Sequence, residues 1–227
     1  MNLRLDWCSH EAAKYAVENW HYSKTMPVPP IIKIGVWENA KFIGVVLFSR
    51  GASSNLYKPY NITHYQGCEL TRVALNKHIS PVTRIIKIAI KMLKKTNPEL
   101  RIIVSFADPH YNHTGGIYQA GNWLYAGKTA KSKEYWHNGK RWHTRQISEK
   151  GWNIQQGQVR KTLKPSMCKV VETPEKYRYL MPLDDEMRKQ IEPLRQPYPK
   201  RPKQATSPVQ GDSGGAAPTR TLQNISR

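Results

Sequence analysis

Apolar runs separated by short polar breaks predict alternating strands and helices over the first two thirds of the chain. IIKIGVW and FIGVVLFS, rich in β-branched and aromatic residues, flank a four-residue turn at Glu38–Lys41 and predict a hairpin. CELTRVAL, RIIVSFA and WLYAGK predict further strands, and RIIVSFA is apolar enough to be buried on both faces. Asn138-Gly139 within YWHNGKRWHTRQ is a strong turn signal and predicts a second hairpin.

Helices are predicted between these strands. SHEAAKYAVENW starts with Ser9 as a candidate N-cap and repeats apolar residues every four positions. Ser80-Pro81 predicts a helix start, because a serine hydroxyl can cap free amides and proline has no amide to satisfy. The helix that follows has an apolar and a basic face over residues 82–95 and should end at Asn97-Pro98. GGIYQAGN predicts a short helix.

This order of elements predicts the α/β class, with a mixed sheet flanked by helices. A chain of 227 residues is slightly long for a single domain, and near Glu192 its composition changes to Pro, Gly, Ser and basic residues. We therefore expect a main domain over residues 1–150, an extension over 151–192 packed on it, and a disordered basic tail over 193–227.

The charge of the chain points to a polyanionic partner. It has 36 Lys and Arg against 16 Asp and Glu, a formal net charge of +20, and nucleic acid is the first candidate. Basic residues between Lys128 and Arg145 are interleaved with aromatic ones, as in surfaces that follow a DNA backbone. No apolar run is long enough for a membrane helix, which favours a soluble intracellular protein. The oligomeric state stays open between monomer and dimer.

The tetrad Asp108-Pro109-His110-Tyr111 follows the predicted buried strand, where open α/β sheets bind their ligands. It is similar to the D/N-P-P-Y/F motif of amino-group DNA methyltransferases, in which the acidic or amide side chain accepts a hydrogen bond from an exocyclic amine. Such an amine is a poor nucleophile because its lone pair is delocalised, so an acceptor must draw off its proton. The alternative is an ordinary Asp-Pro turn at a strand end.

Further candidate residues allow more than one interpretation. Tyr118 is placed like the general-acid tyrosine of GNAT acyltransferases, or it packs in the core. Arg72 lies in an apolar strand and needs a partner, which could be a ligand phosphate, a ligand carboxylate or Glu69. The chain has eight histidines, and one of them with Asp108 could hold iron, although no spacing selects it and a surface or hydrogen-bonded role is the alternative.

Several ordered segments together resemble the phage Mom family of DNA-modification proteins. They are WHYSKTMP, GVWENAKFIGVVLFSRGA, ELTRVAL, SFADP, GGIYQAGNWLYAG and HTRQ, from about Trp20 to Gln146. The resemblance implies a GNAT-like catalytic domain with a mixed twisted sheet. It also implies conversion of the N6 amine of adenine in phage DNA to a carbamoylmethyl derivative, in the host cytoplasm, which shields the DNA from restriction.

The resemblance also implies roles for individual residues. Matched by motif, the candidate catalytic residues are Tyr22, Asp108 and Tyr118, and the candidate iron ligands are His21 and Asp108. An acetyl-CoA or related acyl donor would be bound by Arg72, Ser80, Thr83 and Arg84. The chain departs from GNAT enzymes in the phosphate loop, which here reads ALNKHISPVTRI without a glycine. Phosphate binding would then depend on the free amides at Ser80–Thr83.

Other classes of protein stay open at this point. An acyltransferase acting on a small amine or a protein is compatible with the same fold. An S-adenosylmethionine-dependent methyltransferase is disfavoured because no G-x-G loop follows an early strand. A non-enzymatic DNA-binding protein would need only the charge and the aromatic side chains.

Overall fold

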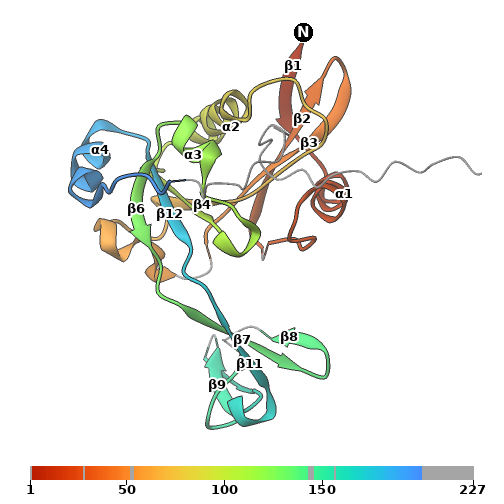
Figure 1. Cartoon of the computed structure of the whole chain (residues 1–227), viewed down its shortest axis with the longest axis vertical. Helices are drawn as coiled ribbons and strands as arrows, with labels where there is room; N and C mark the ends of the chain where they lie inside the picture. The colour runs from red at the N-terminus through yellow and green to blue at the C-terminus, as the bar shows by residue number, and fades with distance from the viewer. Residues whose placement is uncertain (1, 28, 52–53, 143–145, 156, 201–227) are drawn as a thin grey trace, which may run out of the picture.

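The computed structural model describes residues 2–27, 29–51, 54–142, 146–155 and 157–200 (Figure 1). Its main element is a seven-stranded sheet with the order β1-β2-β3-β4-β5-β12-β6. The strands are β1 (Leu3–Trp7), β2 (Ile31–Glu38), β3 (Lys41–Ser49), β4 (Gly67–Leu75), β5 (Ile102–Ala107), β6 (Leu124–Lys128) and β12 (Tyr177–Pro182). Strands β4 and β5 are parallel and the other neighbours are antiparallel, so the sheet is mixed, as predicted.

Helices cover both faces of this sheet. They are α1 (His10–Trp20), α2 (Val82–Thr96), α3 (Gly116–Ala120) and α4 (Asp185–Ile191). The apolar face of α2 packs with α3 on one face, in the largest hydrophobic cluster. On the opposite face α1 covers β3 and β4, and α4 covers β5, β12 and β6. The predicted α/β class, with a mixed sheet flanked by helices, is confirmed. No helix in the described part of the chain is both long and apolar enough to span a bilayer.

Most of the elements predicted from local sequence are present. Ser9 caps α1 by accepting the Ala12 amide, and α2 ends at Thr96 before Asn97, as expected. The turn between β2 and β3 is shorter than predicted, because both Asn39 and Ala40 adopt positive φ and close a two-residue turn. Strands β1 and β12 were not predicted.

The predicted cap at the start of α2 is wrong. The helix begins at Val82, and no side chain caps it. The backbone amides of Ile79 and Ser80 donate instead to the buried carboxylate of Glu38, at 2.9 and 2.6 Å. A carboxylate from a distant strand therefore binds the backbone just before this helix, and its negative charge lies near the helix N-terminus.

A small lobe projects from the main sheet (Figure 1). It contains a three-stranded sheet of β7 (Ser132–His137), β8 (Lys140–Trp142) and β11 (Lys169–Thr173), and a hairpin of β9 (Trp152–Gln155) and β10 (Gln158–Lys161). The Asn138-Gly139 hairpin joins β7 and β8, with positive φ at both residues, as predicted. Within the segment expected as an extension, the chain returns from the lobe as β12 and enters the main sheet between β5 and β6.

The first residues of the predicted tail are ordered, contrary to the expectation of disorder from residue 193. The amide of Gln196 donates to the Tyr125 carbonyl at 2.9 Å, and the Tyr198 hydroxyl donates to the Trp123 carbonyl at 2.7 Å. These bonds attach the segment beside β6, where it provides hydrogen-bond partners for carbonyl groups at the edge of the sheet. The rest of the predicted tail, residues 201–227, lies outside the described residues.

We predict that Gly115→Ala destabilises the protein by roughly 2–4 kcal/mol, since alanine at positive φ costs about 1 kcal/mol and overpacking adds the remainder. Gly115 has φ +82, and an added methyl would overlap the Tyr179 ring. Gly139→Ala is the matched control, because φ there is +71 and no atom lies within 4 Å of the added methyl. Urea unfolding measures both, and equal losses of stability would show that the Tyr179 packing is unimportant.

Candidate active site

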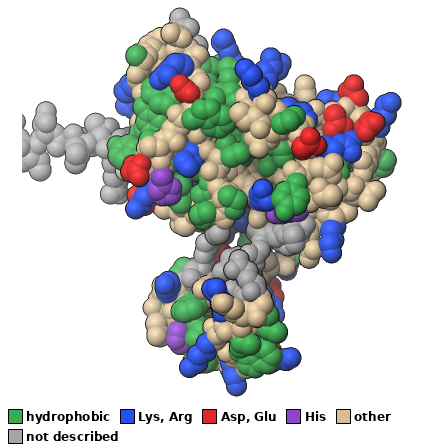
Figure 2. All heavy atoms as spheres, turned by 180° about the vertical axis from the view of Figure 1, so that it is seen from behind, with side chains coloured by type: hydrophobic (Ala, Val, Ile, Leu, Met, Phe, Trp, Pro, Cys, Tyr) green, Lys and Arg blue, Asp and Glu red, His purple; other side chains and the backbone are tan. Residues whose placement is uncertain are grey.

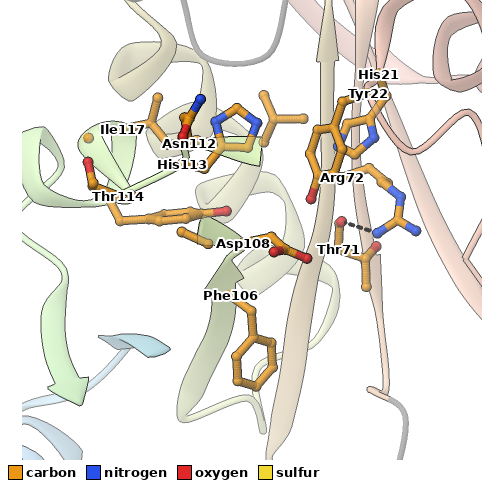
Figure 3. Close-up of a pocket in the computed structure, with 15 residues that line it drawn as sticks. His21, Tyr22, Thr71, Arg72, Phe106, Asp108, Asn112, His113, Thr114 and Ile117 are labelled. Atoms are coloured by element: carbon orange, nitrogen blue, oxygen red, sulfur yellow. Dashed lines mark hydrogen bonds between the residues drawn. The ribbon is translucent and has the colours of Figure 1, made fainter. Parts of the chain in front are cut away.

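A pocket forms where the parallel strands β4 and β5 separate (Figure 3). The two strands pair only from Gly67 opposite Ile102 to Glu69 opposite Val104. Just beyond, the pairing of β4 with β3 is shifted by one residue at Thr71, a bulge that bends the strand and turns side chains toward the gap. Thr71 and Arg72 line the pocket from β4, and residues 106–108 line it from β5.

Asp108 lies at the end of β5 with 13% of its side chain exposed. One carboxylate oxygen accepts the His110 amide at 3.0 Å, as in the Asp-Pro turn that the sequence offered as an alternative. The other oxygen lies 3.2 Å from Nζ of Lys176. Asp108 also lines the pocket. It therefore forms the Asp-Pro turn and is also positioned to contact a ligand. Its role in catalysis stays a prediction.

Tyr22 and neighbouring rings form one wall of the pocket. Its ring centroid lies 4.2 Å from that of His21, 4.4 Å from Tyr111 and 5.0 Å from His113. Burial raises the pKa of the Tyr22 phenol, opposed by Arg72 and reinforced by Asp108. The phenol is therefore neutral at physiological pH.

Tyr118 lies on the facing side of the pocket and is buried. The Ser105 hydroxyl donates to the Leu70 carbonyl at 2.7 Å and lies 2.7 Å from the Tyr118 oxygen. Because serine has a single hydroxyl proton, Tyr118 is the donor to Ser105 in this chain. Burial raises the pKa of Tyr118 far above its ordinary value, so the phenol stays protonated. Tyr118 also packs against Trp123 and Tyr179. The alternative interpretation of Tyr118 as a core residue is therefore correct as well.

His21 is neutral and has no lone pair free to bind a metal. Burial, assisted by Arg72, His113 and Lys24, lowers the pKa of His21 to about 3. The Ser23 amide donates to Nδ1 at 3.1 Å, so Nδ1 carries the lone pair and the ring proton is on Nε2.

The structure does not support the predicted iron site. Nδ1 of His21 accepts the Ser23 amide, and each Asp108 oxygen already has a partner. Among the described residues, no group of three or more His, Cys, Asp or Glu side chains could hold a metal ion.

The predicted donor-binding residues are divided between different places. Arg72 lines the pocket, where Nε donates to the Thr25 carbonyl at 3.3 Å and Nη1 to the Thr71 carbonyl at 2.7 Å. Ser80 is buried at the start of α2, beside Glu38. Thr83 and Arg84 lie on a separate groove between α2, α3 and the end of β12.

One amide of the predicted phosphate site at the start of α2, that of Ser80, already donates to Glu38. Burial raises the pKa of Glu38, but hydrogen bonds from Ser80 and Ile79 outweigh that effect and leave the pKa below its ordinary value. The carboxylate is therefore ionised, and its negative charge beside Ser80 disfavours a phosphate there. The α2 groove instead presents basic side chains, including Arg84, Lys87 and Lys91.

The structure thus brings His21, Tyr22, Arg72, Asp108 and Tyr118 into one pocket, while Ser80, Thr83 and Arg84 lie outside it. Sequence reasoning missed other residues of the site, namely Asn112, His113, Thr114 and Lys176. An asparagine at φ +59 reverses the chain after Asp108, and Asn112 in HYNHTGG was a local signal for that turn. No local signal marked Lys176, which lies just before β12, where the chain returns from the small lobe to the main sheet.

Acetyltransferases are among the solved structures that the fold resembles. Aminoglycoside acetyltransferase AAC(6')-Ib, in complex with coenzyme A and kanamycin, is 10% identical with a TM-score of 0.48, covering 85% of this chain and 98% of that one. The IAA acetyltransferase from Bacillus cereus is 10% identical with a TM-score of 0.41, covering 80% and 100%. The predicted α/β class, with a mixed sheet, is confirmed by the sheet topology itself.

Within this class, the chain belongs to the Mom protein family, whose sequence model matches residues 2–200. The match extends on both sides of the Trp20–Gln146 region that carried the resemblance. A curated relative, the methylcarbamoylase Mom of Escherichia phage Mu, is 26% identical over 205 residues, which are 87% of this chain and 84% of the relative.

We predict that His21 makes the protein less stable in mild acid. Its pKa is about 3 in the folded state and 6.5 in the unfolded chain, so below pH 6.5 the unfolded state binds the proton first. The stability is fully present above pH 6.5, and about 1.4 kcal/mol of it is lost by pH 5.5. Urea unfolding at pH 7.5 and 5.5 measures the change. Between these two pH values, the free energy of unfolding of His21→Gln should fall by about 1.4 kcal/mol less than that of the wild type. A pH dependence unchanged in His21→Gln would contradict the prediction.

Proposed function

We propose that this protein modifies DNA by transferring a carbamoylmethyl group to the N6 amine of adenine, which protects phage DNA from host restriction. One observation carries the proposal: Asp108, Tyr22 and Tyr118 line a single pocket at the gap between β4 and β5. Membership of the Mom family and the name of the phage Mu relative support the same chemistry.

The pocket walls suit a purine turned out of the duplex. An enzyme that acts on a base edge must extrude the base and hold it between flat surfaces. Tyr22 and His113 provide such surfaces in the pocket, and Tyr111 packs on the Tyr22 ring. The Asp108 carboxylate faces the space beside Tyr22 and can accept a hydrogen from N6 (Figure 3).

In the transfer step, N6 forms a bond to the methylene carbon of a donor in which that carbon carries both a leaving group and a carboxamide, and the bond from the carbon to the leaving group breaks. Adenine N6 is a weak nucleophile, so its proton must leave as the new bond forms, and Asp108 is the base that takes it. Lys176 and the His110 amide hold the carboxylate in place. Tyr118 stays protonated because burial raises its pKa, and it is the candidate acid toward the leaving group.

A donor with phosphate groups fits the α2 groove, because Thr83, Arg84, Lys87 and Lys91 line the groove and can hold phosphates. The donor must carry its leaving group on the methylene carbon, because an acetyl thioester carries it on the carbonyl carbon and would leave an N-acetyl group instead. No step is assigned to iron.

We predict that bacteria expressing the protein contain adenosine made heavier by one carbamoylmethyl group, and that Asp108→Asn lowers its yield by about 10²-fold or more. Asp6→Asn is the matched control, because Asp6 pairs with Arg4 on the exposed strand β1. Digesting cellular DNA to nucleosides and measuring their masses gives the yield.

The outcomes distinguish the competing functions. An unaltered nucleoside profile with abundant soluble protein would count against adenine modification. Acetyl-CoA turnover in the absence of DNA would instead support an acyltransferase that acts on a small amine or a protein. DNA binding that persists in Asp108→Asn, with no modified nucleoside from the wild type, would support a non-enzymatic DNA-binding protein.

A further inference from the structure

The small lobe lacks a buried core. None of the described residues between 129 and 176 is buried. Its large apolar side chains are exposed instead, between 37% for Trp136 and 69% for Val159; the others are Trp152, Ile154, Met167, Val170 and Val171. A set of strands that buries so little of its own surface is marginal alone, and an exposed apolar and aromatic surface of this kind marks an interaction site.

The charge of the lobe identifies the kind of partner. Its exposed basic side chains are Lys131, Lys133, Lys140, Lys150, Arg160, Lys161, Lys164 and Lys169, and its exposed acidic ones are Glu149 and Glu172. Figure 2 shows Lys and Arg side chains around the rim of the lobe, beside its hydrophobic patches. Two copies of such a surface would repel each other, whereas a polyanion is attracted to it.

Cations and aromatic rings are paired within the lobe. Lys140 Nζ lies 5.7 Å from the ring centroid of Trp142, and Lys150 Nζ lies 5.3 Å from that of Trp152. Side chains arranged in this way can contact a phosphate with the ammonium group while the ring packs on the adjoining sugar or base. The basic, aromatic stretch seen in the sequence is therefore one part of a larger surface that also includes β9, β10 and β11.

The neck of the lobe lies beside the pocket. The Thr129 amide donates to the Lys176 carbonyl at 2.8 Å, and the Lys176 amide donates to the Thr129 hydroxyl at 2.9 Å. Tyr177 then pairs with Ala107, the last residue of β5, so the neck leaves the sheet at the end that carries Asp108. The Lys176 side chain reaches Asp108 directly, at 3.2 Å.

We propose that the lobe of residues 129–176 is the surface that binds duplex DNA through its phosphates and presents it to the pocket at Asp108. This inference rests on the proposed function. The lobe provides the exposed cations and rings, and the neck fixes where the bound duplex lies relative to the pocket.

The test measures binding of the full-length chain to a fluorescent DNA duplex over a series of salt concentrations. One variant replaces Lys131, Lys133 and Lys140 by Gln. Its control replaces Lys87, Lys91 and Lys95 on α2 by Gln, exposed lysines that remove the same charge from another basic surface. Removing one lysine that neutralises a phosphate lowers the slope of log affinity against log salt by about 1, so the slope of the lobe variant should fall by up to about 3. The slope of the α2 variant should fall by less than about 1.

Equal effects of the two variants, or a larger effect of the α2 variant, would overturn the proposal. So would a lobe variant that binds DNA as the wild type does but sediments as a smaller species, because the lobe would then be an interface between copies. The nucleoside assay is independent of this measurement. If DNA binding depends on the lobe but no modified adenosine is found, only the proposed function is refuted. If modified adenosine is found but DNA binding does not depend on the lobe, only the proposed role of the lobe is refuted.

Discussion

The separation of β4 from β5 is the constraint on which the pocket depends. Two parallel strands that diverge leave backbone groups without ladder partners, and such groups must find others when they are buried. The Ser105 hydroxyl donates a hydrogen bond to the Leu70 carbonyl, just past the last paired residues. Tyr118 donates to Ser105 in turn. The hydrogen bonds of Ser105 therefore link the two strands beside the gap and hold Tyr118, the candidate acid, at its edge.

The electrostatics of the pocket follow from burial. His21, Tyr22 and Tyr118 are all kept uncharged, because burial moves each pKa away from the charged form. The charge left in the pocket is concentrated in Asp108 and Arg72, each held by fixed partners. Under the proposed function, a neutral purine would meet the uncharged Tyr22 ring there and the acidic acceptor Asp108, which suits recognition of an amine by its hydrogens.

How far the sequence could predict this structure depends on the distance between interacting residues. Ser9 and Asn138-Gly139 act within a few positions, and the elements they predict are present. Ser80 has an equally good local signal, yet Glu38, far away in the chain, took the amides that precede the helix. Strand β12 reaches its neighbours only after the whole lobe has intervened, so no local pattern indicated its place.

The same reasoning applies to the pocket. Asp108, Tyr118 and Arg72 were visible from strand, glycine and charge signals, and family motifs added His21 and Tyr22. Lys176 had neither, although it pairs with Asp108. Residue type alone proposed a metal site at His21 and Asp108, whereas the partners that Ser23, His110 and Lys176 provide for these side chains became visible only in the structure.

Under the proposed function, the lobe would separate DNA binding from the chemistry. It is inserted between β6 and β12, whose side-by-side place in the sheet is stabilised by Leu124, Tyr179 and Leu180 in the two hydrophobic clusters. Because none of the described lobe residues is buried, changes of its surface leave the sheet and the pocket intact. The neck is the exception, since Lys176 belongs both to the lobe and to the environment of Asp108. A movement of the lobe would therefore first affect the carboxylate of Asp108, at the end of β5.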